Sequence, residues 1–342
     1  MSKCASLSVI LSCLVCLTAP FAAAGPVLDK IKASGSLSCG VNTEEPEYTL
    51  EDAHGNHTVF DTDICKAIAV AVLGPGAKFK LTAFRDEAES FKALKAGEID
   101  VLATGSVNIR TTSASSGLGF SRPILYDYQG FLVNKTMGVT SPKDLAGKKT
   151  CFLVDSEIGS QTSAYMSREN IKWIPGPFSE EGEMEAAFLT RNCAAITADV
   201  TQLAYEQIAF GRLAKDFEIL PDAASKDPLA AAYRSDDPQW AAIVNWTMEA
   251  LIQAEESGIT QANVSEMKKS NDLVVQRLLG TQRGWSQFIA LDDGWAARII
   301  ETVGNYGEIF ERDLGTGSPM KLARGPNNLW THGGLMCAIP MR

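Results

Sequence analysis

Residues 36–102 alternate between short apolar runs and segments whose apolar residues recur at helical spacing. The short runs predict strands, and in the first predicted helix Ile64, Ala67, Ile68 and Ala71 would share one face. In order, the predicted strand, helix, strand, helix and strand lie at 36–41, 61–73, 79–81, 87–96 and 99–102. Because short loops join them, this alternation predicts a parallel sheet with helices on its faces.

The same alternation returns between residues 128 and 220, and the pattern then changes. Strands are predicted at 128–133, 149–154, 194–197 and 217–220, with a helical turn after Ser141 and helices near 160–169, 181–191 and 200–209. Pro238 opens a long helix to about Glu256, and further helices are predicted at 265–280 and 292–303. The pattern therefore predicts two α/β units followed by a helical C-terminal extension.

Two extended stretches, near 128–134 and 217–234, are the candidate crossings between these units. Two parallel-rich sheets joined by two such strands would leave a cleft at the carboxyl ends of the strands. Open α/β sheets bind small ligands at that edge.

Composition agrees with this organisation. The 342 residues are 45% apolar and 21% charged, which indicates a soluble globular chain of about two domains, each able to bury a core. The 31 basic and 41 acidic residues give a net charge of −10. This charge argues against a nucleic-acid partner, which would require a clustered basic face.

The first 24 residues have the form of a secretory signal peptide. Lys3 precedes an apolar stretch from about Ala5 to Thr18, and Ala22 and Ala24 form a small-residue cleavage site. The apolar stretch is too short to span a bilayer, and no later segment is long enough. We therefore expect cleavage after Ala24 and a soluble mature chain outside the cytoplasm. Cys13 and Cys16 would leave with the peptide, although acylation of one of them, as in a lipoprotein, is an alternative.

Five cysteines remain after cleavage, at 39, 65, 151, 193 and 337. In an oxidising compartment two pairs and one leftover are expected. Pairing by neighbourhood gives Cys39 with Cys65 and Cys151 with Cys193, one of three connectivities that four cysteines allow. Cys337 lies in an apolar tail and is predicted to be a small buried hydrophobic residue.

Six segments resemble the periplasmic solute-binding proteins of general L-amino acid ABC transporters, within the wider family 3 of extracellular solute-binding proteins. They are Cys39–Thr43, Phe60–Cys65, Ala96–Val101, Ser265–Ser270, Val303–Glu311 and Asn328–Met336, and the similarity covers nearly the whole mature chain. The resemblance implies a two-lobed type II periplasmic binding fold, with parallel-rich sheets, two crossover strands and a helical C-terminal extension. It also supports the pairing of Cys39 with Cys65 and of Cys151 with Cys193, because the family's paired cysteines fall at these positions.

The same resemblance implies a periplasmic, monomeric protein without cofactor or metal, which closes on a small-molecule ligand and docks on an inner-membrane ABC permease. The lobes would comprise residues 25–130 with 231–342, and residues 131–230.

The family's ligand site is only partly kept in the first lobe. Family members hold an amino acid's carboxylate with an arginine at the end of a Thr-rich run, and the corresponding run here is 103–113. It places Gly105 and Ser106 at the site. Aligned without gaps, the family's arginine falls on Thr112, and the only guanidinium nearby is that of Arg110. Either the loop shifts by two residues, so that Arg110 binds the carboxylate, or the clamp is lost and Arg110 makes a surface ion pair.

The second lobe departs from the family as well. The family's anion-binding turn corresponds to Val154–Ser160, which contains Ser156 but also Asp155 and Glu157, and these acids would repel a carboxylate. The family's acid for the ligand ammonium corresponds to Asp199, although an Asp at this position could instead cap the helix that follows.

Further acids surround an aromatic residue of the first lobe. Tyr48 stands where family members stack the ligand, and it could equally pack inside the lobe. Glu44, Glu45 and Glu47 precede or flank it, either as ligand contacts or as a solvated rim. Together with the acids of the second lobe they favour a cationic ligand.

His54 and His57 lie in a Gly-Asn turn without a third ligand of defined spacing, so we expect a surface loop rather than a metal site. The sequence therefore predicts a non-enzymatic binding protein for amino acids or related polar solutes. The alternatives are a periplasmic dehydratase that acts on cyclohexadienyl substrates or arogenate, with Glu157 or Asp199 as general acid, and a ligand sensor for a membrane receptor.

Overall fold

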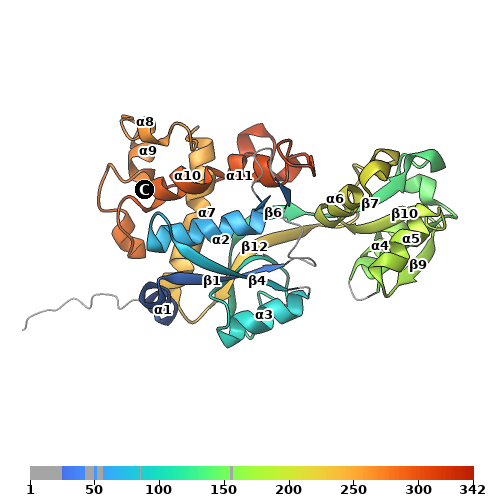
Figure 1. The fold of residues 1–342 in the computed structure, drawn as a ribbon, viewed down its shortest axis with the longest axis horizontal. Coiled ribbons are helices and arrows are strands. Elements are labelled where there is room, and N and C mark those ends of the chain that lie inside the picture. Colours follow the sequence, from blue (N-terminus) through green and yellow to red (C-terminus); the bar gives the residue numbers. More distant parts are fainter. Residues whose placement is uncertain (1–24, 43–49, 52–56, 85, 155–156) are drawn as a thin grey trace, which may run out of the picture.

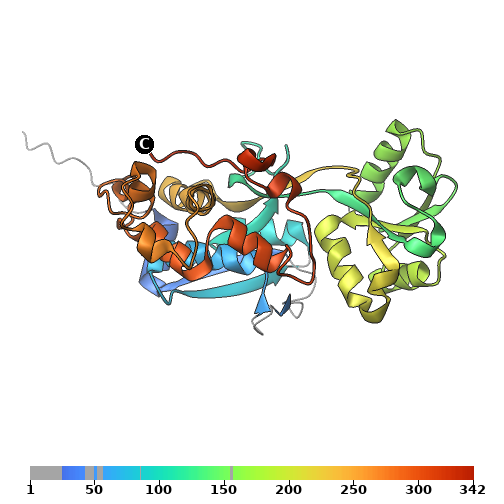
Figure 2. The same cartoon turned by 90° about the horizontal axis from the view of Figure 1, so that it is seen from above.

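A computed structural model describes residues 25–42, 50–51, 57–84, 86–154 and 157–342. Its two five-stranded sheets lie at opposite ends of an elongated molecule and are joined by extended chain (Figures 1 and 2). We call the sheet with strand β1 and its helices the first lobe, and the sheet with strand β7 and its helices the second lobe. Tyr48, Ser156 and the acids at 44, 45, 47 and 155 lie outside the described residues, as do Cys13, Cys16 and His54.

The first sheet has the strand order β4-β1-β5-β12-β6. Its strands are β1 (Ser36–Asn42), β4 (Lys78–Phe84), β5 (Val101–Ser106), β6 (Leu118–Asp127) and β12 (Asp227–Arg234). As the sequence predicts, β1 is parallel to β4 and to β5. Strand β12 is antiparallel to β5 and to β6, so the returning chain completes the sheet.

Helices cover both faces of the first sheet (Figure 1). The helices of the first lobe are α1 (Pro26–Ser34), α2 (Phe60–Leu73), α3 (Glu87–Ala96), α7 (Pro238–Glu256), α8 (Val264–Met267), α9 (Leu273–Leu278), α10 (Trp295–Val303) and α11 (Tyr306–Asp313), of which α8 and α9 pack on other helices. Val101 and Ala103 point into the large core with α2, α7 and α10, whereas Leu102 between them packs into the cluster around α3. This alternation shows that β5 is buried on both faces.

The second sheet has the order β11-β7-β10-β8-β9. Its strands are β7 (Gln129–Asn134), β8 (Lys149–Leu153), β9 (Ile174–Phe178), β10 (Ala195–Asp199) and β11 (Phe217–Ile219), and its helices are α4 (Ile158–Arg168), α5 (Glu181–Leu189) and α6 (Val200–Ala209). The chain passes between the sheets twice, from β6 to β7 and from β11 to β12. These crossings agree with the extended stretches expected near 128–134 and 217–234.

A two-stranded sheet and short helical turns complete the described elements. The small strands are β2 (Leu50–Glu51) and β3 (His57–Thr58). The 3-10 helices are η1 (Lys135–Met137), η2 (Pro142–Leu145), η3 (Gly211–Asp216), η4 (Ser286–Ile289), η5 (Gly325–Asn327) and η6 (Trp330–His332). Within the described ranges, no helix combines the length and the apolar character needed to cross a membrane.

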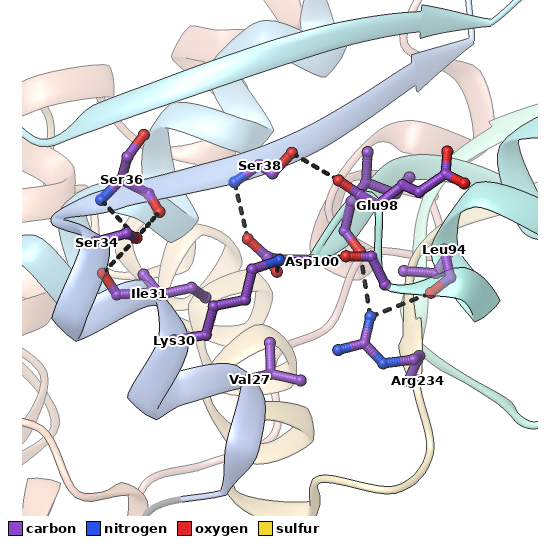
Figure 3. Close-up of polar contacts among 12 residues, drawn as sticks. Val27, Lys30, Ile31, Ser34, Ser36, Ser38, Leu94, Glu98, Asp100 and Arg234 are labelled. Atoms are coloured by element: carbon purple, nitrogen blue, oxygen red, sulfur yellow. Dashed lines mark hydrogen bonds and ion pairs between the residues drawn. The ribbon is translucent and has the colours of Figure 1, made fainter.

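Buried aspartates tie α1 to the amino-terminal edge of the first sheet. Asp100, before β5, accepts hydrogen bonds from the Ser38 backbone at 2.9 Å and from Lys30 Nζ at 2.8 Å (Figure 3). Asp237 begins α7, where it accepts from the Trp240 backbone at 2.9 Å, and it also accepts from the Val27 backbone of α1 at 2.9 Å. These hydrogen bonds stabilise the amino-terminal edge of the first sheet. A ligand-binding site is therefore expected at the opposite edge, where the parallel strands have their carboxyl ends.

Each lobe contains one disulfide. Cys39 of β1 is bonded to Cys65 of α2, and Cys151 of β8 is bonded to Cys193 just before β10, which are the pairs expected from the sequence. The expectation for Cys337 is wrong, because its free thiol is exposed. The extended tail turns Met336 and Ala338 inward, so the residue between them faces solvent.

Three further expectations need correction. The helix predicted over 265–280 is two short helices, because the Asp272 side chain accepts a hydrogen bond from the Val274 backbone at 2.7 Å and begins α9 anew. Strand β5 runs to Ser106 instead of ending at residue 102. Strands β6 and β9 and helices α1 and α11 were not expected at all.

Candidate functional site

The candidate site lies where the two sheets meet. Gly105 and Ser106 end β5, Asp127 ends β6, and Asp199 ends β10. Strand pairing brings them together, because Asp227 at the start of β12 lies opposite Asp127 and two residues from the partner of Ser106. On the other side of the crossing, Gln129 pairs with Asp199. The register of the crossing strands therefore gathers residues that are far apart in the sequence.

Three of the four carboxylates gathered here accept hydrogen bonds. Glu87 Oε1 accepts from the Ser106 backbone at 2.7 Å, and Asp227 Oδ2 accepts from Ser106 Oγ at 3.0 Å. Asp127 accepts from Thr201 Oγ1 at 2.5 Å and from the Tyr128 backbone at 2.8 Å. These bonds fix the positions of the three carboxylates.

Asp199 differs from the other three acids. It stands at the N-cap position of α6 without making a side-chain capping bond, and among the described residues no group donates a hydrogen bond to its carboxylate. Asp127 meets the start of α6 instead, since the Thr201 hydroxyl donates to its Oδ2, and the Val200 backbone donates to Tyr128 O at 2.9 Å. Asp199 does not make the capping bond considered for it and is left available to a ligand.

The burial and mutual repulsion of these acids favour the binding of a cation. Burial raises the pKa of Asp199 to about 7, with further increases from the charges of Asp127, Asp227 and Glu87. Burial also raises the pKa of Asp227 to about 6, against the lowering effect of the Ser106 hydrogen bond, and it raises the pKa of Asp127. None of the ion pairs formed among the described residues includes any of the four acids. An ammonium group at this position would relieve their mutual repulsion.

Arg110 lies outside this acidic cluster. It sits in the loop after β5 and forms an ion pair with Glu157, directly before α4 of the second lobe, so the pair links the two lobes. Both side chains are exposed, by 78% and 62% respectively. Thr112, the other position considered for a carboxylate clamp, donates its hydroxyl to Asn108 O of its own loop at 2.7 Å.

Sequence reasoning identified Asp199, Gly105 and Ser106 but missed Glu87, Asp127 and Asp227. A usable signal was present, because Asp127 directly precedes the first stretch expected to cross between the lobes and Asp227 lies within the second.

Two parallel-rich sheets, between which the chain crosses twice, with Glu87, Asp127, Asp199 and Asp227 forming an acidic junction at the crossings, define a periplasmic binding protein fold. Residues 37–262 match the bacterial extracellular solute-binding proteins, family 3, and the chain belongs to this family.

Relatives support this assignment over nearly the full length. The chain is 41% identical to the general L-amino acid-binding periplasmic protein AapJ of Rhizobium johnstonii, with 94% of both chains covered. It is 38% identical to the glutamate/glutamine/aspartate/asparagine-binding protein BztA of Rhodobacter capsulatus, over 94% of this chain and 95% of that protein. A solved periplasmic binding protein of an ABC transporter from Brucella ovis, with glutathione bound, superposes with a TM-score of 0.82 at 39% identity, covering 92% of this chain and 99% of that one.

Proposed function

We propose that this protein is the periplasmic substrate-binding component of an ABC importer and that it binds an amino acid or a related small polar solute between its lobes. The acidic junction carries this proposal, because four carboxylates without a basic partner among the described residues form a receptor for an ammonium group. The family and the names of the relatives support it. We place the lobe boundaries in the two crossings, between β6 and β7 and between β11 and β12, close to the boundaries at 130/131 and 230/231 expected from the sequence.

Asp199 would be the principal ammonium ligand. Its carboxylate accepts no hydrogen bond from the described residues, whereas the other three acids accept bonds from Ser106 or from residues at the start of β7 and α6. Ser106 lies between Glu87 and Asp227 and would keep them oriented. A charge-assisted hydrogen bond from ammonium to Asp199 would contribute about 1.5–3 kcal/mol.

The site favours ligands with more positive than negative groups. A ligand carboxylate that approached Arg110 would compete with Glu157 for the same guanidinium. Glu157 also stands at the start of α4, where a family member would offer backbone N–H groups to an anion. We therefore infer a ligand such as a basic amino acid or a polyamine, in which the ammonium groups dominate recognition.

Binding would couple to lobe closure. The segments between β6 and β7 and between β11 and β12 join the lobes, and they are the natural hinges. A ligand that contacts both lobes stabilises the closed state, and the permease would recognise that state. The protein would act as a monomer without enzymatic activity, exported to the periplasm by the signal peptide expected at residues 1–24.

Ligand-dependent thermal stabilisation tests this proposal. The mature protein is heated with arginine, lysine, putrescine, glutamate or glutathione, and a ligand that binds only the folded state raises Tm. We expect the cationic ligands to raise Tm and Asp199→Asn to weaken their binding about ten- to hundred-fold. Asp29→Asn, on the exposed face of α1, is the matched control and should leave affinity unchanged. Stabilisation by glutamate alone would refute the cationic preference, and stabilisation by none of the five would refute this ligand class.

A further inference from the structure

A cavity lies in the C-terminal helical extension, far from the acidic junction. It has a volume of about 350 Å³, within the range of about 300–1,000 Å³ typical of small-molecule sites. Its walls come from α7, α9, η4, the start of α10 and the C-terminal tail. Figures 1 and 2 place these elements at the end of the first lobe that faces away from the second lobe. A ligand here would not contact both lobes.

Four of the ten residues that line the cavity are aromatic. Trp246, Trp285, Phe288 and Trp295 all contribute to it. Phe288 is 75% exposed, an unusual state for a large apolar side chain, whereas Trp295 is buried at the base. Aromatic walls of this kind favour a flat apolar ligand, which stacks against or meets the ring edges.

A basic side chain, that of Arg277, lines the cavity. Arg277 stacks on Trp285 with its guanidinium carbon 4.5 Å from the ring centroid, and it donates to Gln282 Oε1 at 2.9 Å and to Met341 O at 3.1 Å. None of the ion pairs among the described residues includes Arg277. Arg342 also lines the cavity.

The single acid of the lining is already engaged. Asp293 accepts hydrogen bonds from the Ser286 hydroxyl and from the Gly284 backbone, and these bonds lower its pKa. It therefore stays ionised and would repel an anionic group placed beside it. Arg277 is the charged side chain of the lining with which an anionic ligand could pair.

We propose that this cavity is a second ligand site, which binds a small aromatic carboxylate. The ring would pack against Trp285 and Phe288, and the carboxylate would pair with Arg277, whose guanidinium is held in place by Trp285, Gln282 and the tail. Stacking orients the guanidinium, so a carboxylate would meet a preorganised donor fork at small entropic cost.

Calorimetric titration with 3-phenylpropionate and with its neutral amide tests the proposal. We expect the carboxylate to bind with a stoichiometry of one and the amide to bind about ten-fold or more weakly, because only the acid pairs with Arg277. Arg277→Ala should weaken binding of the acid about ten- to hundred-fold and leave that of the amide nearly unchanged. Equal affinity for acid and amide, or no measurable binding of the acid, would overturn the proposal.

Three further variants separate this site from folding effects and from the acidic junction. Phe288→Ala removes an exposed wall and should weaken binding of the acid several-fold without lowering Tm, so it reports on the cavity even where Arg277→Ala disturbs the tail. Arg212→Ala removes an exposed arginine of the second lobe, outside the lining, and is the matched control. Asp199→Asn should leave binding of the acid intact. Loss of binding in Asp199→Asn, or retention in both Arg277→Ala and Phe288→Ala, would place the ligand elsewhere and refute the proposal.

Discussion

Replacing Asp199 by asparagine should stabilise the ligand-free protein at alkaline pH while impairing its binding site. The pKa of Asp199 is raised from 3.8 to about 7, so the folded state holds this proton more tightly than the unfolded state does. Between these pKa values the folded state binds more protons, and the stability contributed by this group falls as pH rises. The difference between 3.8 and about 7 corresponds to about 4 kcal/mol, an upper bound because solvent reaches part of the side chain.

Urea unfolding of wild type and Asp199→Asn at about pH 8 and about pH 4 measures this effect. At the higher pH the variant should be more stable by up to about 4 kcal/mol, because the wild type then carries an ionised, partly buried Asp199 beside Asp127 and Asp227. At the lower pH the carboxyl group is protonated in the folded protein, and the advantage should nearly vanish. An equal stability difference at both pH values would refute the reasoning.

The same titration predicts the pH dependence of ligand binding. An ammonium ligand pairs with the ionised form of Asp199, so its affinity for the wild type should fall as pH decreases below about 7. In Asp199→Asn this pH dependence should be strongly reduced. Calorimetry over that pH interval provides the comparison, and a wild-type affinity independent of pH would contradict the role assigned to Asp199.

Three other predictions concern stability and the link between the lobes. Replacing Cys151 and Cys193 together by serine should lower the free energy of unfolding by about 2–5 kcal/mol, measured by urea unfolding under oxidising conditions. Asp237→Ala should cost about 2–4 kcal/mol, because one buried carboxylate accepts hydrogen bonds at the starts of both α1 and α7, and an unchanged Tm would contradict this role. Glu157→Gln should change stability by less than about 1 kcal/mol because the pair is exposed, yet it should improve binding of carboxylate ligands by freeing Arg110; calorimetry with glutamate decides this point.

Local patterns predicted the elements whose boundaries are set locally. Helix α3 runs over Glu87–Ala96 as expected, between an Asp86 side chain that caps its start and Gly97 with a positive φ at its end. Strands β6 and β9 escaped prediction because Pro123 interrupts one and Pro175 and Pro177 the other. Both are edge strands, where a residue without a backbone N–H is tolerated.

The site shows the same division between local and long-range information. Asp199 could be named because the resemblance aligns it with an acid at the end of a strand of the second lobe. Asp127 and Asp227 were missed although they lie at or within the expected crossings, because only the pairing of β6 with β12, about a hundred residues apart in the sequence, brings them together. The role of Arg110 could not be predicted for the same reason. Its ion-pair partner, Glu157, belongs to the other lobe, and no pattern in the loop of Arg110 predicts that contact.

The capping of α1 by Asp237 has a consequence for the order in which the molecule is assembled. The two partners are separated by 210 residues, and β12 joins the first sheet only just before Asp237. A chain that emerges from its N-terminus can complete the second lobe, whose strands lie between Gln129 and Ile219, while the first lobe still lacks a strand and a helix cap. During that interval β5 is an open sheet edge, so we expect the first-made half of the protein to be the last to become native and the part in greatest need of a chaperone.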